Sequence, residues 1–169
     1  MDMDSIPLVQ AVSVSDALRF FHSNIHDMIS PERVAQDETL YVASILADYA
    51  TANSSCPKSL PPLKNLAEVF DQFVMSGGEI SDPEILEIGG AQTIFFNGFF
   101  RDQMRRRHNV QLFDDLGRSF YARASHHSRS RERQVFFDRM AHQLSFWTHT
   151  CRDLSRYLRA NEVLPMIFN

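Results

Sequence analysis

Two histidines near the start of the chain have the spacing of metal ligands. His22 and His26 are four residues apart, so a helix would place both rings on one face, as a metal ion requires. The acid of zinc-binding His-Glu motifs is missing, because Ser23 follows His22. His142 and His149 form a second pair, seven residues apart, that could converge on the same ion. The pattern favours surface or boundary histidines, with a metal site as the alternative hypothesis.

Arginine supplies most of the positive charge and forms two clusters. Residues 1–90 contain 14 acids and 4 Lys or Arg, a balance of −10, whereas residues 91–169 contain 7 acids and 13 Arg, a balance of +6. Guanidinium groups bind phosphates and carboxylates, so nucleic-acid binding through residues 101–133 is one hypothesis. We favour the alternative that the oppositely charged halves pack together, or meet in a symmetric oligomer. The clustered arginines are Arg105, Arg106, Arg107, Arg129, Arg131 and Arg133.

The sequence contains no catalytic signature. A nucleophile elbow, a phosphate-binding loop and a dinucleotide-binding glycine motif are all absent. Cys56 and Cys151 are the only cysteines and form no metal-binding pair. Cys151 falls on an apolar helical stripe, where a buried thiol is expected. We therefore predict no catalytic residue and no cofactor, and we favour a protein that is not an enzyme.

The elements that must position these residues are all predicted to be helices. Apolar residues recur at intervals of three and four in six segments, and no segment alternates as a strand does. The sequence therefore predicts an all-α fold, a single-domain bundle of about six helices over residues 1–169. Residues 1–12 are expected to be a flexible N-terminus and residues 53–62 a loop.

Helix start and stop signals divide the first half of the chain. Ser13 is a candidate N-cap for a helix that extends to about Met28. Pro31, after a serine and before a glutamate, predicts the start of the second helix. A third helix is expected over residues 63–73, with a stop at the glycine pair 77–78. Pro83, preceded by an aspartate, predicts the start of the fourth.

The fourth predicted helix is apolar on most of its sides, which is typical of a central helix. It is expected to end near His108. Gly98 lies among its phenylalanines and predicts close approach of a second helix, whereas Gly89 and Gly90 predict a kink or a helix break.

Two further helices are predicted after the central one. The fifth is expected over residues 111–125 with Leu112, Leu116 and Phe120 inward, and residues 126–131 read as a polar connector. The last helix has the most regular apolar stripe. Its members are Phe137, Met140, Leu144, Trp147, Cys151, Leu154 and Leu158.

Residues 87–121 combine features that resemble a known motif. They contain a glycine pair, an Ile-Phe pair, a Gly-Phe-Phe segment, an arginine triplet and a Leu-Gly-Arg-Ser segment followed by Phe-Tyr. This arrangement resembles a motif of uncharacterised bacterial all-helical proteins, with Asn97 in place of a serine and Phe120 in place of an alanine. The resemblance implies an all-helical fold and supplies no mechanism.

These observations lead to two hypotheses of function. The sequence contains no run of 18 apolar residues, so no membrane span is expected. The acidic N-terminus and the low number of cysteines, two in the whole chain, favour a cytoplasmic protein. The first hypothesis is a non-enzymatic binding or accessory protein that associates with itself, as a homodimer, or with another protein. The alternative is a helical bundle that binds a small ligand or a metal. Its candidate ligand-binding residues are Tyr41, Tyr49, Arg118 and Tyr121, and its candidate metal ligands are His22 and His26.

Overall fold

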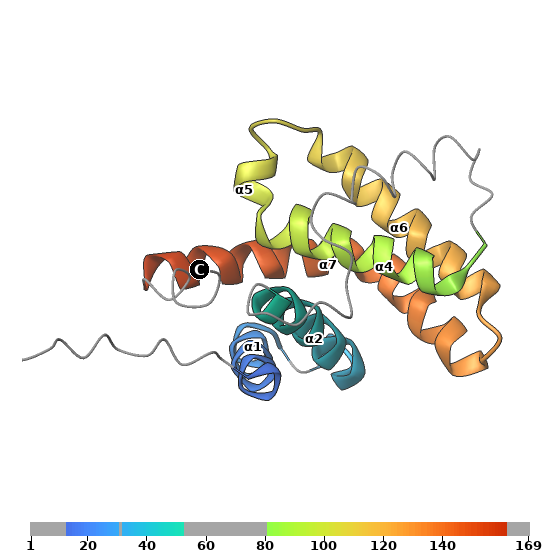
Figure 1. Cartoon of the computed structure of the whole chain (residues 1–169), viewed down its shortest axis with the longest axis horizontal. Helices are drawn as coiled ribbons and strands as arrows, with labels where there is room; N and C mark the ends of the chain where they lie inside the picture. The colour runs from blue at the N-terminus through green and yellow to red at the C-terminus, as the bar shows by residue number, and fades with distance from the viewer. Residues whose placement is uncertain (1–12, 31, 53–80, 162–169) are drawn as a thin grey trace, which may run out of the picture.

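The computed structural model describes residues 13–30, 32–52 and 81–161, and within these ranges every regular element is a helix (Figure 1). The predicted all-α bundle is thus confirmed. The predictions for residues 1–12, 53–62, 63–73 and 77–78 lie outside the described residues. The elements in chain order are α1 (Val14–Met28), α2 (Gln36–Ala52), α4 (Pro83–Thr93), the π-helix η1 (Ile94–Phe99), α5 (Arg101–Met104), α6 (Val110–His127) and α7 (Arg131–Ala160).

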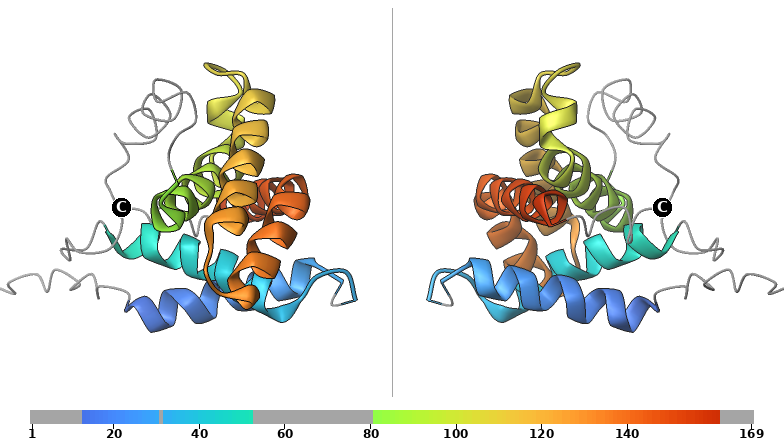
Figure 2. Two further views of the ribbon diagram at one scale, coloured as in Figure 1. Left: turned by 90° about the vertical axis from the view of Figure 1, so that its right-hand side faces the viewer. Right: turned by 90° about the vertical axis from the view of Figure 1, so that its left-hand side faces the viewer.

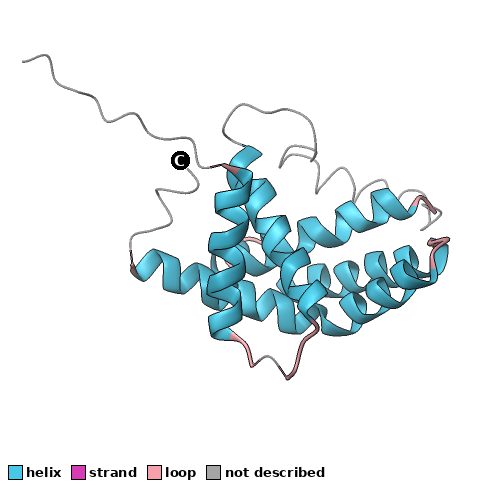
Figure 3. Ribbon diagram, turned by 90° about the horizontal axis from the view of Figure 1, so that it is seen from below, coloured by secondary structure: helices cyan, strands magenta, loops and turns pink. Residues whose placement is uncertain are grey.

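The helices form two groups that pack on each other (Figures 1 and 2). α1 and α2 pair as a hairpin, and this hairpin lies against α7. α6 and α7 form a second hairpin, with α4 packed on α6 and η1 packed on α7. Seen from below, only short loops join the helices within the described ranges (Figure 3). α4 and η1 therefore occupy the centre of the second group.

Side-chain caps explain where several helices begin. The Ser13 hydroxyl accepts a hydrogen bond from the Asp16 backbone N–H at 3.1 Å, which confirms the predicted start of α1. Asp82 accepts from the Glu84 N–H at 2.9 Å, with Pro83 in the first turn, which confirms the start of α4. Asn109 caps α6 in the same way.

The predicted start of the second helix at Pro31 was wrong. α2 begins at Gln36, and the chain before it makes a turn in which the Arg33 N–H donates to the Ser30 carbonyl at 3.0 Å. A helix that started at Pro31 would leave only two residues after Met28 to reverse the chain. The longer turn gives the room that packing α2 back on α1 requires.

The glycine pair in α4 does not kink or break the helix, contrary to prediction. α4 continues through Gly89 and Gly90, and both glycines face α6. A Cβ atom built on Gly90 would lie 2.6 Å from the Tyr121 ring, and one on Gly89 would lie 3.0 Å from the Phe120 ring. The missing side chains of the two glycines therefore let the Phe120 and Tyr121 rings pack against α4, and the pair is not a hinge.

The predicted single helix that ends near His108 is divided in the structure. The α-helical hydrogen-bond pattern changes to a π-helix at Ile94, and a turn at Phe100 separates η1 from the short helix α5. The chain then turns through residues 105–108 before α6. In a π-helix each backbone N–H bonds to the carbonyl five residues before it rather than four.

α7 and α6 differ in how well their inward faces were predicted. All seven residues of the predicted α7 stripe are buried, so that prediction is confirmed. In α6 Phe120 is buried and Leu116 half-buried, but Leu112 is 52% exposed. Gly117 sets the rotation of α6, because Thr93 and Leu144 approach within 2.6 and 2.8 Å of where its Cβ would lie. Leu112, five residues earlier, is turned about 140° from that face.

α6 is also longer than predicted. It continues through His126 and His127, and only residues 128–130 connect it to α7.

Replacing Gly98 by alanine should lower stability. The new Cβ would lie 3.0 Å from Cys151 Cβ and 3.1 Å from the Thr148 Cα of α7, and that backbone cannot move freely. Overpacking costs about 1–3 kcal/mol, more than the helix-propensity gain of roughly 1 kcal/mol. Thermal unfolding should show a lower Tm for Gly98→Ala and a larger drop for Gly90→Ala.

Ser23→Ala is the matched control, because Ser23 is exposed on α1. It should leave the Tm unchanged or raise it slightly. A Tm increase in Gly98→Ala would contradict the close crossing of η1 and α7.

Candidate functional site

The two N-terminal histidines share a face of α1 as predicted, but without further ligands. The His22 and His26 ring centroids are 6.3 Å apart, and the Asp27 carboxylate lies 4.0 Å from His26. No group of three or more His, Cys, Asp or Glu side chains within ranges 13–30, 32–52 and 81–161 is placed to hold a metal. His142 and His149 are exposed on α7, each bonded to the carbonyl four residues before it. The structure therefore brings His22 and His26 together, and His142 and His149 do not join them.

Two of the predicted ligand residues, Tyr49 and Tyr121, lie in the core, and the half-buried Tyr41 packs against it. The Tyr41 and Tyr121 hydroxyls are 3.2 Å apart, and Tyr121 is fully buried. Burial first, and then the neighbouring tyrosine and Glu87, raises the pKa of Tyr41 well above its ordinary value. Burial likewise raises the pKa of Tyr121. Glu87 is in turn paired with Arg133 at 2.7 Å. Both phenols are thus neutral and bonded to each other.

Tyr49 lies in an aromatic stack beside a buried amide. Its ring is parallel to Phe95 at a centroid distance of 4.0 Å, and burial raises its pKa. Gln92 lies close enough to act on the Tyr49 hydroxyl. Yet neither the hydroxyl nor the Gln92 amide atoms reach hydrogen-bond geometry with a partner among the described residues, although Gln92 is fully buried. Sequence reasoning missed Gln92, because a polar residue in an apolar helix gives no sign of its surroundings.

Arg118 does not join the tyrosines. Its guanidinium pairs with Asp115 at 2.7 Å and also donates to the Ser145 hydroxyl of α7. The predicted set of three tyrosines and one arginine is therefore a buried aromatic cluster and a separate surface arginine.

The predicted basic region is split into two separate clusters. Arg105, Arg106 and Arg107 are exposed in the turn after α5, and Arg129, Arg131 and Arg133 are exposed around the start of α7. These places lie at opposite ends of α6 (Figure 1). α6 has 18 residues and is therefore about 27 Å long. The arginines therefore do not form one continuous surface.

A buried ion pair that sequence reasoning missed joins the centre of the fold to α6. Arg101, 9% exposed, makes two hydrogen bonds to the carboxylate of Asp114, 1% exposed, at 3.2 and 3.0 Å. Asn97 of the π-helix donates to the same carboxylate at 2.5 Å and to the Val110 carbonyl at 2.7 Å. The four-residue spacing of Asn97 and Arg101 was a usable signal, because it predicts one helix face. This network is structural, since each charge meets its partner inside the protein.

Cys151 does not have the properties of a reactive thiol. The residue is fully buried, and burial raises its pKa to about 12. A thiol with that pKa is protonated at neutral pH and is a poor nucleophile.

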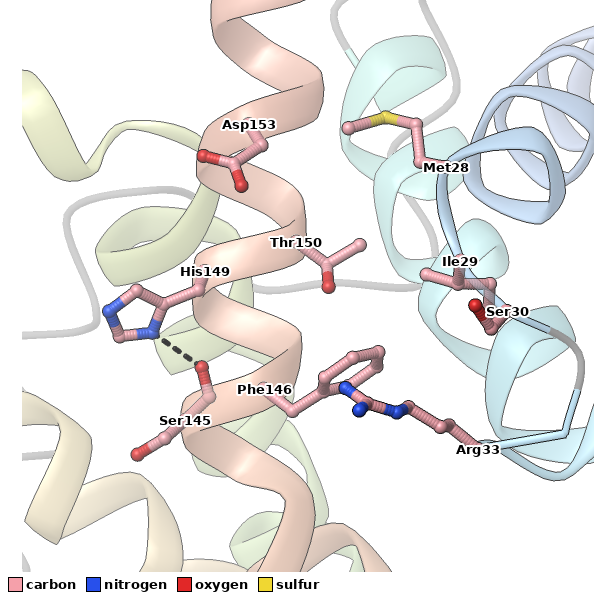
Figure 4. A pocket seen from close by; sticks show the side chains of 9 residues that line it. All are labelled: Met28, Ile29, Ser30, Arg33, Ser145, Phe146, His149, Thr150 and Asp153. Carbon is pink, nitrogen blue, oxygen red and sulfur yellow. Dashed lines mark hydrogen bonds between the residues drawn. The ribbon is translucent and has the colours of Figure 1, made fainter.

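The structure has an open groove between the α1–α2 turn and α7 (Figure 4). Its volume is about 520 Å³, within the range of roughly 300–1,000 Å³ that is typical of ligand sites. The lining residues are Met28, Ile29, Ser30, Arg33, Ser145, Phe146, His149, Thr150 and Asp153. A second, smaller hollow of about 380 Å³ lies between the end of α6 and the start of α7. None of the predicted tyrosines lines either one.

Comparisons with protein families, curated proteins and solved structures find no match to this chain. The resemblance of residues 87–121 to a bacterial helical family therefore stays a prediction. None of the described helices is long and apolar enough to cross a membrane. The described residues thus form a helical bundle with an open groove lined by polar and apolar side chains.

Removing Asp114 should destabilise the protein far more than removing its neighbour Asp115. Asp114→Ala leaves Arg101 buried without its partner, which costs about 3–5 kcal/mol. Asp115→Ala breaks the exposed pair with Arg118, which contributes about 0–1 kcal/mol, and an exposed hydrogen bond from Gln111. Urea denaturation monitored by circular dichroism measures both free energies of unfolding. Equal losses would show that the Arg101–Asp114 pair is not buried as described.

Cys151 should resist thiol reagents in the folded protein. In a Cys56→Ser background it is the only thiol. The rise of its pKa from 9.0 to about 12 lowers the thiolate fraction at pH 8 about 1,000-fold. Labelling followed by absorbance should be slow in buffer and fast in urea. Rapid labelling of the native protein would contradict the buried position.

Proposed function

We propose that this chain is a non-enzymatic, cytoplasmic accessory protein that acts by binding another protein. The observation that carries the proposal is the open groove of about 520 Å³ between the α1–α2 turn and α7. Its lining combines polar side chains with apolar ones, among them Met28, which is 41% exposed. An open surface that combines apolar and polar side chains has the composition of a protein–protein interface.

Self-association as a homodimer has less support than binding a different protein. The sequence favours a homodimer because the apolar central helix and the long last helix predict more apolar surface than a monomer covers. In the structure those side chains are largely covered, with Phe95 and Phe99 of η1 at most 2% exposed and the α7 stripe buried. The exposed large apolar residues are scattered over several helices. They are Val14, Met28, Leu40, Ile85, Leu112, Val135 and Tyr157.

The alternatives of a metal or small ligand and of nucleic acid have weaker support. His22 and His26 supply two ligands, fewer than the three or four that protein zinc sites use. Tyr41 and Tyr121 hold each other in the core. The two arginine clusters lie at opposite ends of α6, and the net charge of the chain is −4. Each of these features is explained by packing or by a solvated surface.

The proposal predicts a stable complex of fixed stoichiometry. Affinity purification from the cells that produce the protein, followed by reconstitution from the two purified components, should give one defined mass by light scattering. The isolated chain should keep its monomer mass across a concentration series. Two results would contradict the proposal: no partner that reconstitutes, or turnover of a substrate by the isolated chain. A concentration-dependent rise in mass would instead favour the homodimer.

A further inference from the structure

Three arginines of α7 gather around one carboxylate of α5, where α5 meets the C-terminal half of α7 (Figure 1). The Arg156 guanidinium makes two hydrogen bonds, both of 2.8 Å, to the carboxylate oxygens of Asp102. These bonds lower the pKa of Asp102, desolvation opposes them, and the charges of Arg156, Arg152 and Arg159 lower that pKa further. All three guanidinium groups therefore lie close enough to Asp102 to act on its charge.

Two more arginines lie beside the same acid on its own helix. Arg105 and Arg106 follow Asp102 by three and four residues. The Arg105 N–H donates to the Arg101 carbonyl at 2.8 Å, so the chain is still helical there. Helical residues three and four apart share a face, and Asp102 faces α7. Both exposed arginines thus extend the basic surface of α7 onto α5.

Together these side chains form a cluster with more cations than its acids neutralise. The α5–α7 cluster consists of Arg105, Arg106, Arg152, Arg156 and Arg159. Two carboxylates belong to it, because Asp153 pairs with Arg152 at 2.8 Å as Asp102 pairs with Arg156. No acid among the described residues forms an ion pair with the other three arginines.

The cluster is a basic patch on an acidic chain. Its five arginines and two acids sum to +3 and the whole chain has −4, so all other residues together carry −7. Water solvates the exposed guanidinium groups in the free protein, but it does not neutralise them, and crowded like charges repel each other. A bound anion removes this repulsion, and a carboxylate matches the fork of a guanidinium group.

The charge distribution favours a short acidic segment over a nucleic acid. A nucleic-acid strand is charged along its whole length, so it would extend from the cluster over the acidic remainder of the surface. A short segment contacts the cluster alone, because salt screens charges more than about 8–10 Å away. From Arg152 to Arg159 α7 rises about 10 Å, the length of roughly three extended residues.

The cluster adjoins the open groove on α7. Asp153 lies at the end of the groove and pairs with Arg152 of the cluster (Figure 4). A partner that occupies the groove therefore reaches the arginines by continuing along α7.

We propose that the α5–α7 cluster binds an acidic segment of the partner protein, with carboxylates on Arg105, Arg106 and Arg159. The inference rests on the proposed function and specifies the charge that the partner presents. The groove supplies mixed polar and apolar contacts, and the cluster selects for Asp and Glu beside them.

The test measures fluorescence anisotropy with two labelled eight-residue peptides. In one Glu alternates with Ser, and in the other Gln replaces every Glu. The Glu peptide should bind at least about tenfold more tightly than the Gln peptide. The double variant Arg105→Gln, Arg106→Gln should weaken binding of the Glu peptide about tenfold, and Arg159→Gln should weaken it severalfold.

The double variant Arg129→Gln, Arg131→Gln is the matched control. It removes the same charge from two exposed arginines around the start of α7, about 40 Å from Arg159. Its affinity for the Glu peptide should stay within about twofold of the unchanged protein. Thermal unfolding checks every variant. Arg105 and Arg106 are exposed, so replacing them should leave the fold intact and keep the experiment decisive if Arg159→Gln is unstable.

Three outcomes would overturn the inference. Equal binding of the Glu and Gln peptides, or binding of neither, would exclude carboxylate recognition. Equal weakening by the two double variants would show general attraction to exposed arginines. Tighter binding of a labelled eight-nucleotide thymidine strand than of the Glu peptide would assign the cluster to nucleic acid.

The reconstituted complex separates this inference from the proposed function. A complex that forms equally well with the Arg105→Gln, Arg106→Gln variant would remove the cluster from the interface and leave the proposed function standing. Failure of any partner to reconstitute with the unchanged protein would contradict the proposed function, and the peptide affinities would still decide whether the cluster recognises carboxylates.

Discussion

The fold depends on how closely neighbouring helices approach the continuous central segment made by α4 and η1. Gly90 admits the Tyr121 ring of α6, and Gly98 admits the backbone of α7 at Thr148. Gly117 performs the same role from the α6 side, because Thr93 of α4 fills the space of its missing side chain. Each glycine makes its helix less stable than alanine would, by up to about 1 kcal/mol. Close packing of the core offsets that cost, and it fixes which faces of α6 and α7 turn inward.

Buried charges fix the alignment of the helices that the glycines bring together. The Arg101–Asp114 pair joins the segment after η1 to the start of α6. On the other side, the carboxylate of Glu38, 3% exposed, accepts from the Trp147 indole at 3.2 Å and pairs with Arg139 at 3.0 Å, so α2 is tied to α7. Desolvation offsets much of the attraction in such pairs. Their effect on the fold is therefore mainly one of geometry, because a shifted helix would leave a charge buried alone.

The candidate reactive groups inside the protein differ from the side chains of the groove, because only the latter are open to a partner. The tyrosines that looked like a ligand site are neutral and bonded to each other, and the central thiol is protonated. The open groove lies where the α1–α2 turn meets α7. Packing the hairpin against α7 thus both covers the core and creates the groove on which the proposed function is based.

The sequence by itself determined the helices and several of their ends. The spacing of apolar residues in α7 and the caps at Ser13 and Asp82 are local properties, so they survive in any all-α arrangement. Tertiary structure decided the rest. Three features depend on contacts between residues far apart in the chain: the rotation of α6 that exposes Leu112, the packing of the glycine pair against two aromatic rings, and the groove between the α1–α2 turn and α7. The spacing of apolar residues predicts which face of a helix is buried, but not which other helix packs against that face. A groove between helices depends on that packing.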